Sequence, residues 1–289
     1  MPPVIAAMRP KQWIKNVLVA VAPVAGGVMF HSGVWWHVLV AFAAFSVSAS
    51  GLYIFNDIND VESDKLHPKK SRRPIASGAL GVKPARGVAI GCLLAGLLLC
   101  MALPLSFFLI LAAYIVITQA YSFGLKRQAV IELACVASGF VLRALAGGAA
   151  TNTHLSVWFV LVVSFGALFV VTGKRLAEMP REGVAGEKRV VLADYTKSFL
   201  ESVLTLSATA AILAYCLWSF SSSGVLGRAH VHVVLVQLSV LPVVLAVLYI
   251  LLLLDGGKGG APEELAVHDR TLQILGVGWV LLLVTAVYL

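Results

Sequence analysis

Charged residues are scarce in this sequence. Asp, Glu, Lys and Arg make up 12% of the 289 residues, whereas 60% are hydrophobic. An average soluble domain carries about twice that share of charge. The apolar residues fall in long uninterrupted runs rather than in short amphipathic pieces, which is typical of membrane-spanning helices. This pattern excludes an ordinary soluble protein.

Cysteine is also sparse, and its four copies lie inside apolar runs, at positions 92, 100, 135 and 216. No CxxC or Cys/His ligand spacing is present, so neither a zinc site nor a disulfide framework is predicted. The net charge of +8 does not point to nucleic acid, because the sequence contains none of the known nucleic-acid-binding motifs. In a membrane protein such an excess of basic residues reflects topology.

The hydrophobic runs predict an all-α polytopic protein with nine transmembrane helices. Each run is close to the roughly 20 residues that cross a bilayer. Between the third and fourth runs only Leu103 and Pro104 turn the chain, and proline is well suited to begin a helix. The predicted spans are 13–30, 34–55, 84–102, 105–124, 130–150, 155–175, 197–220, 232–254 and 268–289.

The loops between these spans differ in charge. The segments 31–33, 103–104, 151–154 and 221–231 contain one basic residue, Arg228, whereas nearly all the others lie on the opposite side. The positive-inside rule therefore predicts a cytoplasmic N-terminus in the plasma membrane.

All 14 acidic residues lie on or beside the cytoplasmic side as well, although topology does not require this. We therefore expect one transmembrane domain, 1–289, with the cytoplasmic loops 56–83 and 176–196 over an active site.

Oxygen-bearing side chains gather where the second predicted span ends. On a helix, Asn56, Asp57, Asp60 and Asp64 would share about a quarter of the circumference, and Glu62 would point elsewhere. Carboxylates placed this close repel one another unless a cation binds them. Mg²⁺ prefers oxygen ligands and leaves positions free for substrate phosphates. The motif thus predicts a magnesium–pyrophosphate site, with a solvated acidic helix end as the alternative.

Basic residues follow the acidic motif. Arg72 and Arg73 could bind phosphate oxygens, and arginine can do so with two parallel hydrogen bonds. The alternative is a topogenic basic loop that touches anionic lipid. Arg143 is the exception inside a span, so we expect it to face the bundle interior, either as a site residue or paired with Glu132.

These motifs resemble the UbiA superfamily of intramembrane prenyltransferases. The family has nine transmembrane helices and an NDxxDxxxD motif at the cytoplasmic end of helix 2, and Asn56, Asp57, Asp60 and Asp64 fill every fixed position. The segment from Arg73-Pro74 to Gly78 resembles the RPxxxG that follows. Tyr121 and Lys126 are similar to the Tyr/Lys segment after helix 4. The resemblance implies that Asp57, Asp60 and Asp64 bind Mg²⁺, the one cofactor expected.

One group within the superfamily, the decaprenyl-phosphate phosphoribosyltransferases, is more similar than the rest. The opening RPKQWIKN, from Arg9 to Asn16, resembles that of the group, as do His67-Pro68 and the GKR of 173–175 with Glu178. The resemblance implies transfer of phosphoribose from 5-phosphoribosyl 1-pyrophosphate to decaprenyl or another polyprenyl phosphate, for cell-wall arabinan. The second acidic motif of ordinary prenyltransferases is absent here, and 174–178 offers one acid and two cations.

The resemblance also implies roles for individual residues. Lys11 and Lys15 would attract the lipid phosphate, and Asn56 would position a ligand. The candidates for binding the donor phosphates are Arg72, Arg73, Lys174, Arg175, Glu178, Lys126 and Tyr121. The sequence leaves open a homo-oligomer, a prenyltransferase that uses an aromatic acceptor, and a transporter.

Overall fold

The structure is a computed structural model that describes residues 1–179, 190–221, 232–256 and 262–289. The described chain is helical and contains no β-strand. Within these residues, eight helices are long and apolar enough to cross a membrane. Arg228 and residues 180–189 of the predicted loop 176–196, with Lys188 and Arg189 among them, fall outside the described residues.

The eight long helices match eight of the nine predicted spans closely. Two of the eight consist of two successive elements. One is α5 (Val82–Leu99), which continues as η3 (Cys100–Ala102), and the other is α10 (Val233–Leu238) followed by α11 (Val240–Asp255). The others are α3 (Val34–Asn59), α6 (Leu105–Phe123), α7 (Ile131–Ala150), α8 (Val157–Glu178), α9 (Lys197–Phe220) and α13 (Arg270–Tyr288).

The first predicted span is not a single α-helix, so the count of nine is not confirmed. The N-terminal segment forms α1 (Pro3–Met8), a 3₁₀ helix η1 (Pro10–Ala20) and α2 (Val21–Ala25). Arg9, which joins α1 to η1, has a left-handed backbone with φ 52°. Proline and glycine explain the interruptions, since Pro10 and Pro23 each lack an amide donor and Gly27 has φ 69°.

Short helices connect the long ones. They are α4 (Val61–Lys65), η2 (Lys70–Arg72), η4 (Leu125–Arg127), η5 (Val190–Asp194) and α12 (Pro262–His268). The chain divides into two compact units. Unit 1 comprises residues 1–24, 28–126 and 142–154, and unit 2 comprises 25–27, 127–141 and 155–289.

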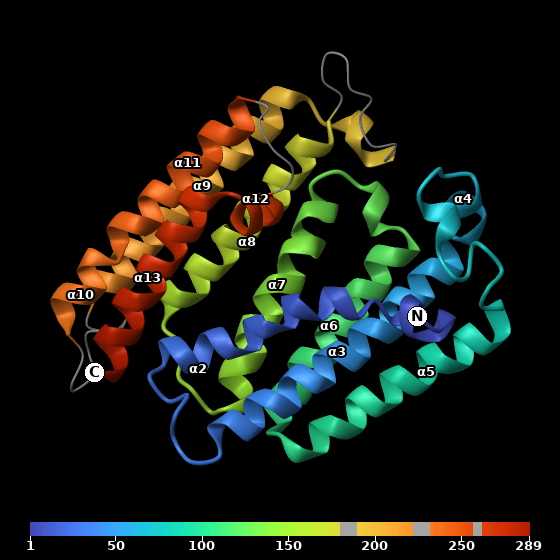
Figure 1. The fold of residues 1–289 in the computed structure, drawn as a ribbon, viewed down its shortest axis with the longest axis horizontal. Helices are drawn as coiled ribbons and strands as arrows, with labels where there is room; N and C mark the ends of the chain where they lie inside the picture. The colour runs from blue at the N-terminus through green and yellow to red at the C-terminus, as the bar shows by residue number, and fades with distance from the viewer. Residues whose placement is uncertain (180–189, 222–231, 257–261) are drawn as a thin grey trace. The chain divides into compact units, whose positions relative to one another are not determined.

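Unit 1 is organised around α3, which packs along α5 (Figure 1) and against η1 and α6. Small residues allow this contact to be close. A side chain at Gly51 would collide with the carbonyl of Ala89, and one at Gly96 would collide with Ser48. Phe45 and Phe107 are fully buried in the core, where their rings meet edge to face at 5.9 Å.

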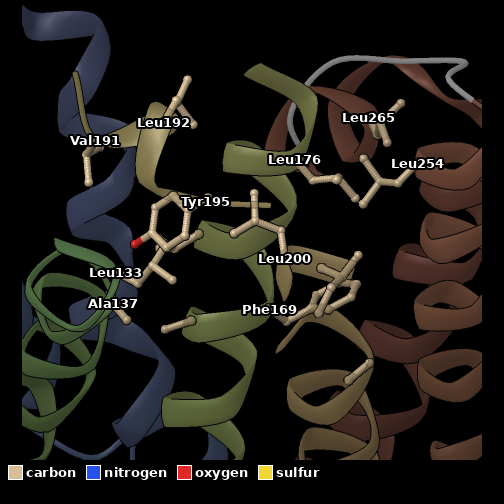
Figure 2. Close-up of a cluster of buried hydrophobic side chains, with 14 of the residues drawn as sticks. Leu133, Ala137, Phe169, Leu176, Val191, Leu192, Tyr195, Leu200, Leu254 and Leu265 are labelled. Atoms are coloured by element: carbon tan, nitrogen blue, oxygen red, sulfur yellow. The ribbon is translucent and has the colours of Figure 1, made fainter. Parts of the chain in front are cut away.

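Unit 2 is organised around the pair α8 and α9. Its core is built from α7, α8, the segment before α9, α9 itself and α11, as Figure 2 shows for Leu133, Phe169, Tyr195, Leu200 and Leu254. Val191, Leu192 and Tyr195 anchor the chain directly before α9 in this core. Thr196 then caps α9, because its hydroxyl accepts a hydrogen bond from the Phe199 amide.

Candidate active site

The acidic motif lies at the end of α3, where the helix is nearly continuous with α4. The Asp60 amide donates to the carbonyl of Asn56 at 2.9 Å, and the Asp64 amide donates to that of Asp60 at 2.8 Å. Asp57 and Asp64 are buried at 2% and 3% exposure, whereas the Glu62 side chain is 82% exposed and pairs with Lys65. Glu62 therefore points away, as predicted.

Each aspartate of the motif has a basic partner. Asp57 accepts from Arg9 Nη2 at 2.5 Å, and it shares Arg73 Nη1 with Asp64, at 3.1 Å and 2.6 Å respectively. Asp60 accepts from Lys126 Nζ at 2.6 Å. The Asn56 amide donates to Asp60 at 3.1 Å, so it orients that carboxylate. The predicted candidates Arg73 and Lys126 thus lie beside the aspartates of the motif, and Asn56 binds one of these aspartates.

Arg73 is held by the turn that follows it. Its backbone is extended, with ψ 145°, as expected for a residue before proline. Its carbonyl accepts from Ser77 at 2.9 Å, and Gly78 closes the turn at φ 80°. The next part of the loop is anchored because Ile75 and Leu80 are buried in a cluster with residues of α3 and α5. The RPxxxG sequence therefore encodes a turn that directs the guanidinium toward the aspartates.

Arg9 was not among the predicted site residues, although it begins the RPKQWIKN sequence. A row of polar residues on α3 fixes the segment that carries it. Ser50 Oγ donates to the Met8 carbonyl at 3.0 Å and accepts from Trp13 Nε1 at 3.0 Å. The Arg9 guanidinium lies 5.3 Å from the centre of the Tyr53 ring. This arrangement directs Arg9 onto Asp57.

A signal for this contact is present in the sequence. Ser46, Ser50, Tyr53 and Asp57 recur at intervals of four, three and four residues, so they form one polar face on an otherwise apolar helix. Ser46 accepts from Asn16 Nδ2 at 3.0 Å. Such a face predicts a polar partner, but its spacing does not say which segment supplies it.

The carboxylates suit a divalent cation that arrives with its own ligands. Asp57 and Asp64 direct oxygens at a single nitrogen of Arg73, so a positive charge already occupies the point between them. Among the described residues, no group of three or more His, Cys, Asp and Glu side chains forms a ready-made metal cage. Mg²⁺ commonly takes one or two carboxylates and completes its shell with water and substrate phosphates. The donor set fits that mode of binding.

The predicted donor-binding residues at the end of α8, in unit 2, have contacts that differ from the expectation. Arg175 is buried at 2% exposure and binds Glu132 through Nε and Nη2, both at 2.8 Å, while Nη1 donates to Glu178 at 2.9 Å. Its donors thus bind protein carboxylates, which argues against the predicted phosphate contact and favours a structural role. Lys174, on the same turn, is partly exposed.

Tyr195 completes this buried group. Its hydroxyl accepts from the Val130 amide at 2.7 Å and lies 3.5 Å from Glu132 Oε1. Burial raises the pKa of Tyr195 above its ordinary value, so the hydroxyl is neutral at pH 7. Val130 has φ 67°, which is unusual for a β-branched residue. The hydroxyl therefore satisfies an amide in a strained connection.

The remaining candidates are distributed over unit 1. Lys11 is exposed and Lys15 partly exposed on η1, Arg72 is exposed, and Tyr121 on α6 is partly buried. Arg143 does face the interior, as expected. It donates to Asn16 and Tyr114 at 2.7 and 2.8 Å. Glu132, the other partner considered for it, binds Arg175.

These features define a class of protein, a multi-pass helical membrane protein with an acidic site at the end of one span. A family model described as the UbiA prenyltransferase family matches residues 17–275. The chain belongs to this family.

Relatives of known structure share its fold. A UbiA homologue from Archaeoglobus fulgidus, solved bound to GPP and Mg²⁺, superposes with a TM-score of 0.72 at 18% identity, covering 99% of each chain.

Closer relatives in sequence are two curated proteins called decaprenyl-phosphate phosphoribosyltransferase. The one from Corynebacterium glutamicum is 42% identical, over 99% of this chain and 86% of its own. The one from Mycobacterium tuberculosis (strain H37Rv) is also 42% identical, over 96% of this chain and 91% of its own. The resemblance inferred from the sequence motifs is thereby confirmed.

Proposed function

We propose that this protein transfers 5-phosphoribose from 5-phosphoribosyl 1-pyrophosphate to decaprenyl phosphate and releases pyrophosphate. The observation that carries the proposal is the 42% identity, over nearly the whole chain, with relatives that bear the name of this activity. The fold is consistent with it, since the Archaeoglobus homologue of the same fold is bound to GPP, a pyrophosphate-bearing molecule, together with Mg²⁺. The lipid is then the acceptor, and the product is a precursor of the arabinose donor for cell-wall arabinan.

The reaction breaks the bond between C1 of the ribose and the pyrophosphate oxygen, and it forms a bond between C1 and a phosphate oxygen of the lipid. Mg²⁺ bound by Asp57, Asp60 and Asp64 would supply positive charge to stabilise the leaving pyrophosphate. Asn56 orients Asp60, to which it is hydrogen-bonded. The lipid phosphate is already an anion at neutral pH, so the protein does not need a strong general base.

The basic residues would bind the phosphates. Arg73 and Lys126 lie beside the carboxylates, where the pyrophosphate would bind, and exposed Arg72 extends the positive charge. Lys174 would contact the donor, with Tyr121 as a further contact. Arg175 and Glu178 form an ion pair at the end of α8, next to Lys174 in the chain. Lys11 and Lys15, on the N-terminal segment, would attract the lipid phosphate on the cytoplasmic face.

The second candidate function is transfer of a prenyl chain from its diphosphate to an aromatic acceptor. The family name and the GPP-bound relative favour it. The sequence at 174–178 argues against it, because the second acidic motif is replaced by Lys174 and Arg175, and Glu178 is bound to Arg175.

The test is an assay of the purified protein in lipid nanodiscs. Radiolabelled 5-phosphoribosyl 1-pyrophosphate is supplied with decaprenyl phosphate and Mg²⁺, and a parallel reaction contains GPP with 4-hydroxybenzoate. We expect labelled lipid in the first reaction and no prenylated product in the second. Chelation of Mg²⁺ should abolish formation of the labelled lipid. Turnover of the prenyl diphosphate without phosphoribosylation of the lipid would contradict the proposal.

A further inference from the structure

The acidic motif is balanced by cations from three separate parts of unit 1. Arg9 comes from the N-terminal segment, Arg73 from the turn after α4, and Lys126 from η4 after α6. Three positive charges thus face the three carboxylates. Because Asp57 and Asp64 are almost fully buried, leaving them without counter-ions would be costly. The protein therefore neutralises this motif with its own side chains.

The same cations are suited to a second set of partners. Arginine and lysine bind phosphate oxygens through charge-assisted hydrogen bonds as readily as they bind carboxylates. The side chains of Arg9, Arg73 and Lys126 are 28%, 25% and 24% exposed, so each is accessible from outside the protein. By contrast, the Arg175 side chain is 3% exposed and is held by two carboxylates.

We propose that Arg9, together with Arg73 and Lys126, is an exchangeable counter-ion of the acidic motif. In the ligand-free protein these residues hold the carboxylates, and when metal and pyrophosphate bind together they transfer their hydrogen bonds to the pyrophosphate. This inference rests on the proposed function, since it requires the motif to bind a divalent cation. It adds that Arg9, on the N-terminal segment, couples metal binding to binding of the pyrophosphate.

The exchange has a thermodynamic consequence. A metal ion that binds alone must take Asp57 from Arg9 and leaves that guanidinium with no anion. When metal and pyrophosphate bind together, the pyrophosphate provides the Arg9 guanidinium with a new anion. Metal and pyrophosphate must then strengthen each other's binding, and by linkage the effect is the same in either order.

Binding of Mn²⁺ to the purified full-length protein, followed by electron paramagnetic resonance, tests this directly without turnover. In the wild type we expect pyrophosphate to raise the affinity for Mn²⁺ by about tenfold. Arg9→Met should bind Mn²⁺ alone several-fold more tightly than the wild type, because a competing cation is gone. Pyrophosphate should then raise the affinity by less than in the wild type, since only Arg73 and Lys126 remain to exchange. Arg9→Lys, which keeps the charge, should restore most of the coupling.

Lys65→Met is the matched control, because it removes a cation from the neighbouring acid Glu62, outside the motif. It should titrate like the wild type. The inference is overturned if Arg9→Met binds Mn²⁺ alone no more tightly than the wild type, or if pyrophosphate does not change the affinity of the wild type. Absence of Mn²⁺ binding in every protein would instead overturn the metal site of the proposed function, and this inference with it.

Discussion

At the scale of the residue, neighbouring acids in one short segment have different environments. Asp57 and Asp64 are buried and bound to arginines, whereas Glu62, only two residues before Asp64, is exposed and pairs with Lys65. The helical period places them on different faces. Charge alone therefore does not define this motif, and a neutral substitution should reduce activity strongly at Asp64 and hardly at all at Glu62.

Asp64→Asn keeps the shape of the side chain but removes a charge from the motif. We expect the rate of phosphoribosyl transfer to fall by at least about 100-fold, because stabilisation of the leaving group is lost. Glu62→Gln is the matched control and should retain nearly full activity. Both are measured by the labelled-lipid assay on protein purified from membranes. Equal losses in the two variants would show that the acids act only through net charge.

At the scale of the element, the turn from Arg73 to Gly78 connects a sequence motif with the direction of a guanidinium. Gly78→Ala tests it, since φ 80° is unfavourable for alanine although no atom lies within 4 Å of the added carbon. We expect a loss of about 1 kcal/mol in stability. The Michaelis constant for 5-phosphoribosyl 1-pyrophosphate should rise as Arg73 loses its fixed position.

Gly87→Ala provides the control for that prediction. Gly87 also has open space around it but lies inside α5 with an ordinary helical backbone. Alanine there should be neutral or stabilising by up to about 1 kcal/mol. If thermal unfolding in detergent shows the two variants to be equally stable, the strain assigned to Gly78 is absent.

The ends of α7 and α8 are joined by Arg175 and Glu132. Arg175→Met leaves Glu132 fully buried without its counter-charge, so we expect about 3–5 kcal/mol of destabilisation. The double variant Arg175→Met/Glu132→Leu removes both charges and should recover much of that loss. Lys174→Met, on the same turn, should lower the melting temperature far less. Thermal unfolding followed by fluorescence compares the three, and an unrecovered double variant would contradict the assignment.

At the scale of the whole molecule, hydropathy predicted the long helices well. The fourth predicted span, 105–124, corresponds to α6 at Leu105–Phe123, and the seventh, 197–220, to α9 at Lys197–Phe220. The span 13–30 is not confirmed as one long helix, and an average over apolar residues does not register that Trp13 and Asn16 bind serines of α3. Helical periodicity likewise grouped the aspartates correctly. Of their cations, Arg73 and Lys126 were among the predicted candidates, but Arg9 could not be predicted, since it is 48 residues from Asp57.

The orientation in the membrane stays a prediction that labelling can test. In a variant without the four native cysteines, Ser77→Cys and His154→Cys place exposed thiols in two different connections of unit 1. With a cytoplasmic N-terminus, a membrane-impermeant maleimide added to spheroplasts should label His154→Cys only. Ser77→Cys should react once the membrane is permeabilised. The reverse pattern would place the acidic motif on the outer side.

The polar face of α3 has a consequence for how the protein is made. Ser46, Ser50 and Asp57 would each meet lipid at high cost if α3 entered the membrane alone. Their partners Asn16, Trp13 and Arg9 precede α3 in the chain, so they have left the ribosome before it is complete. We expect the two segments to insert as a hairpin, in which the N-terminal segment is bound to the polar face of α3 while α3 enters the membrane.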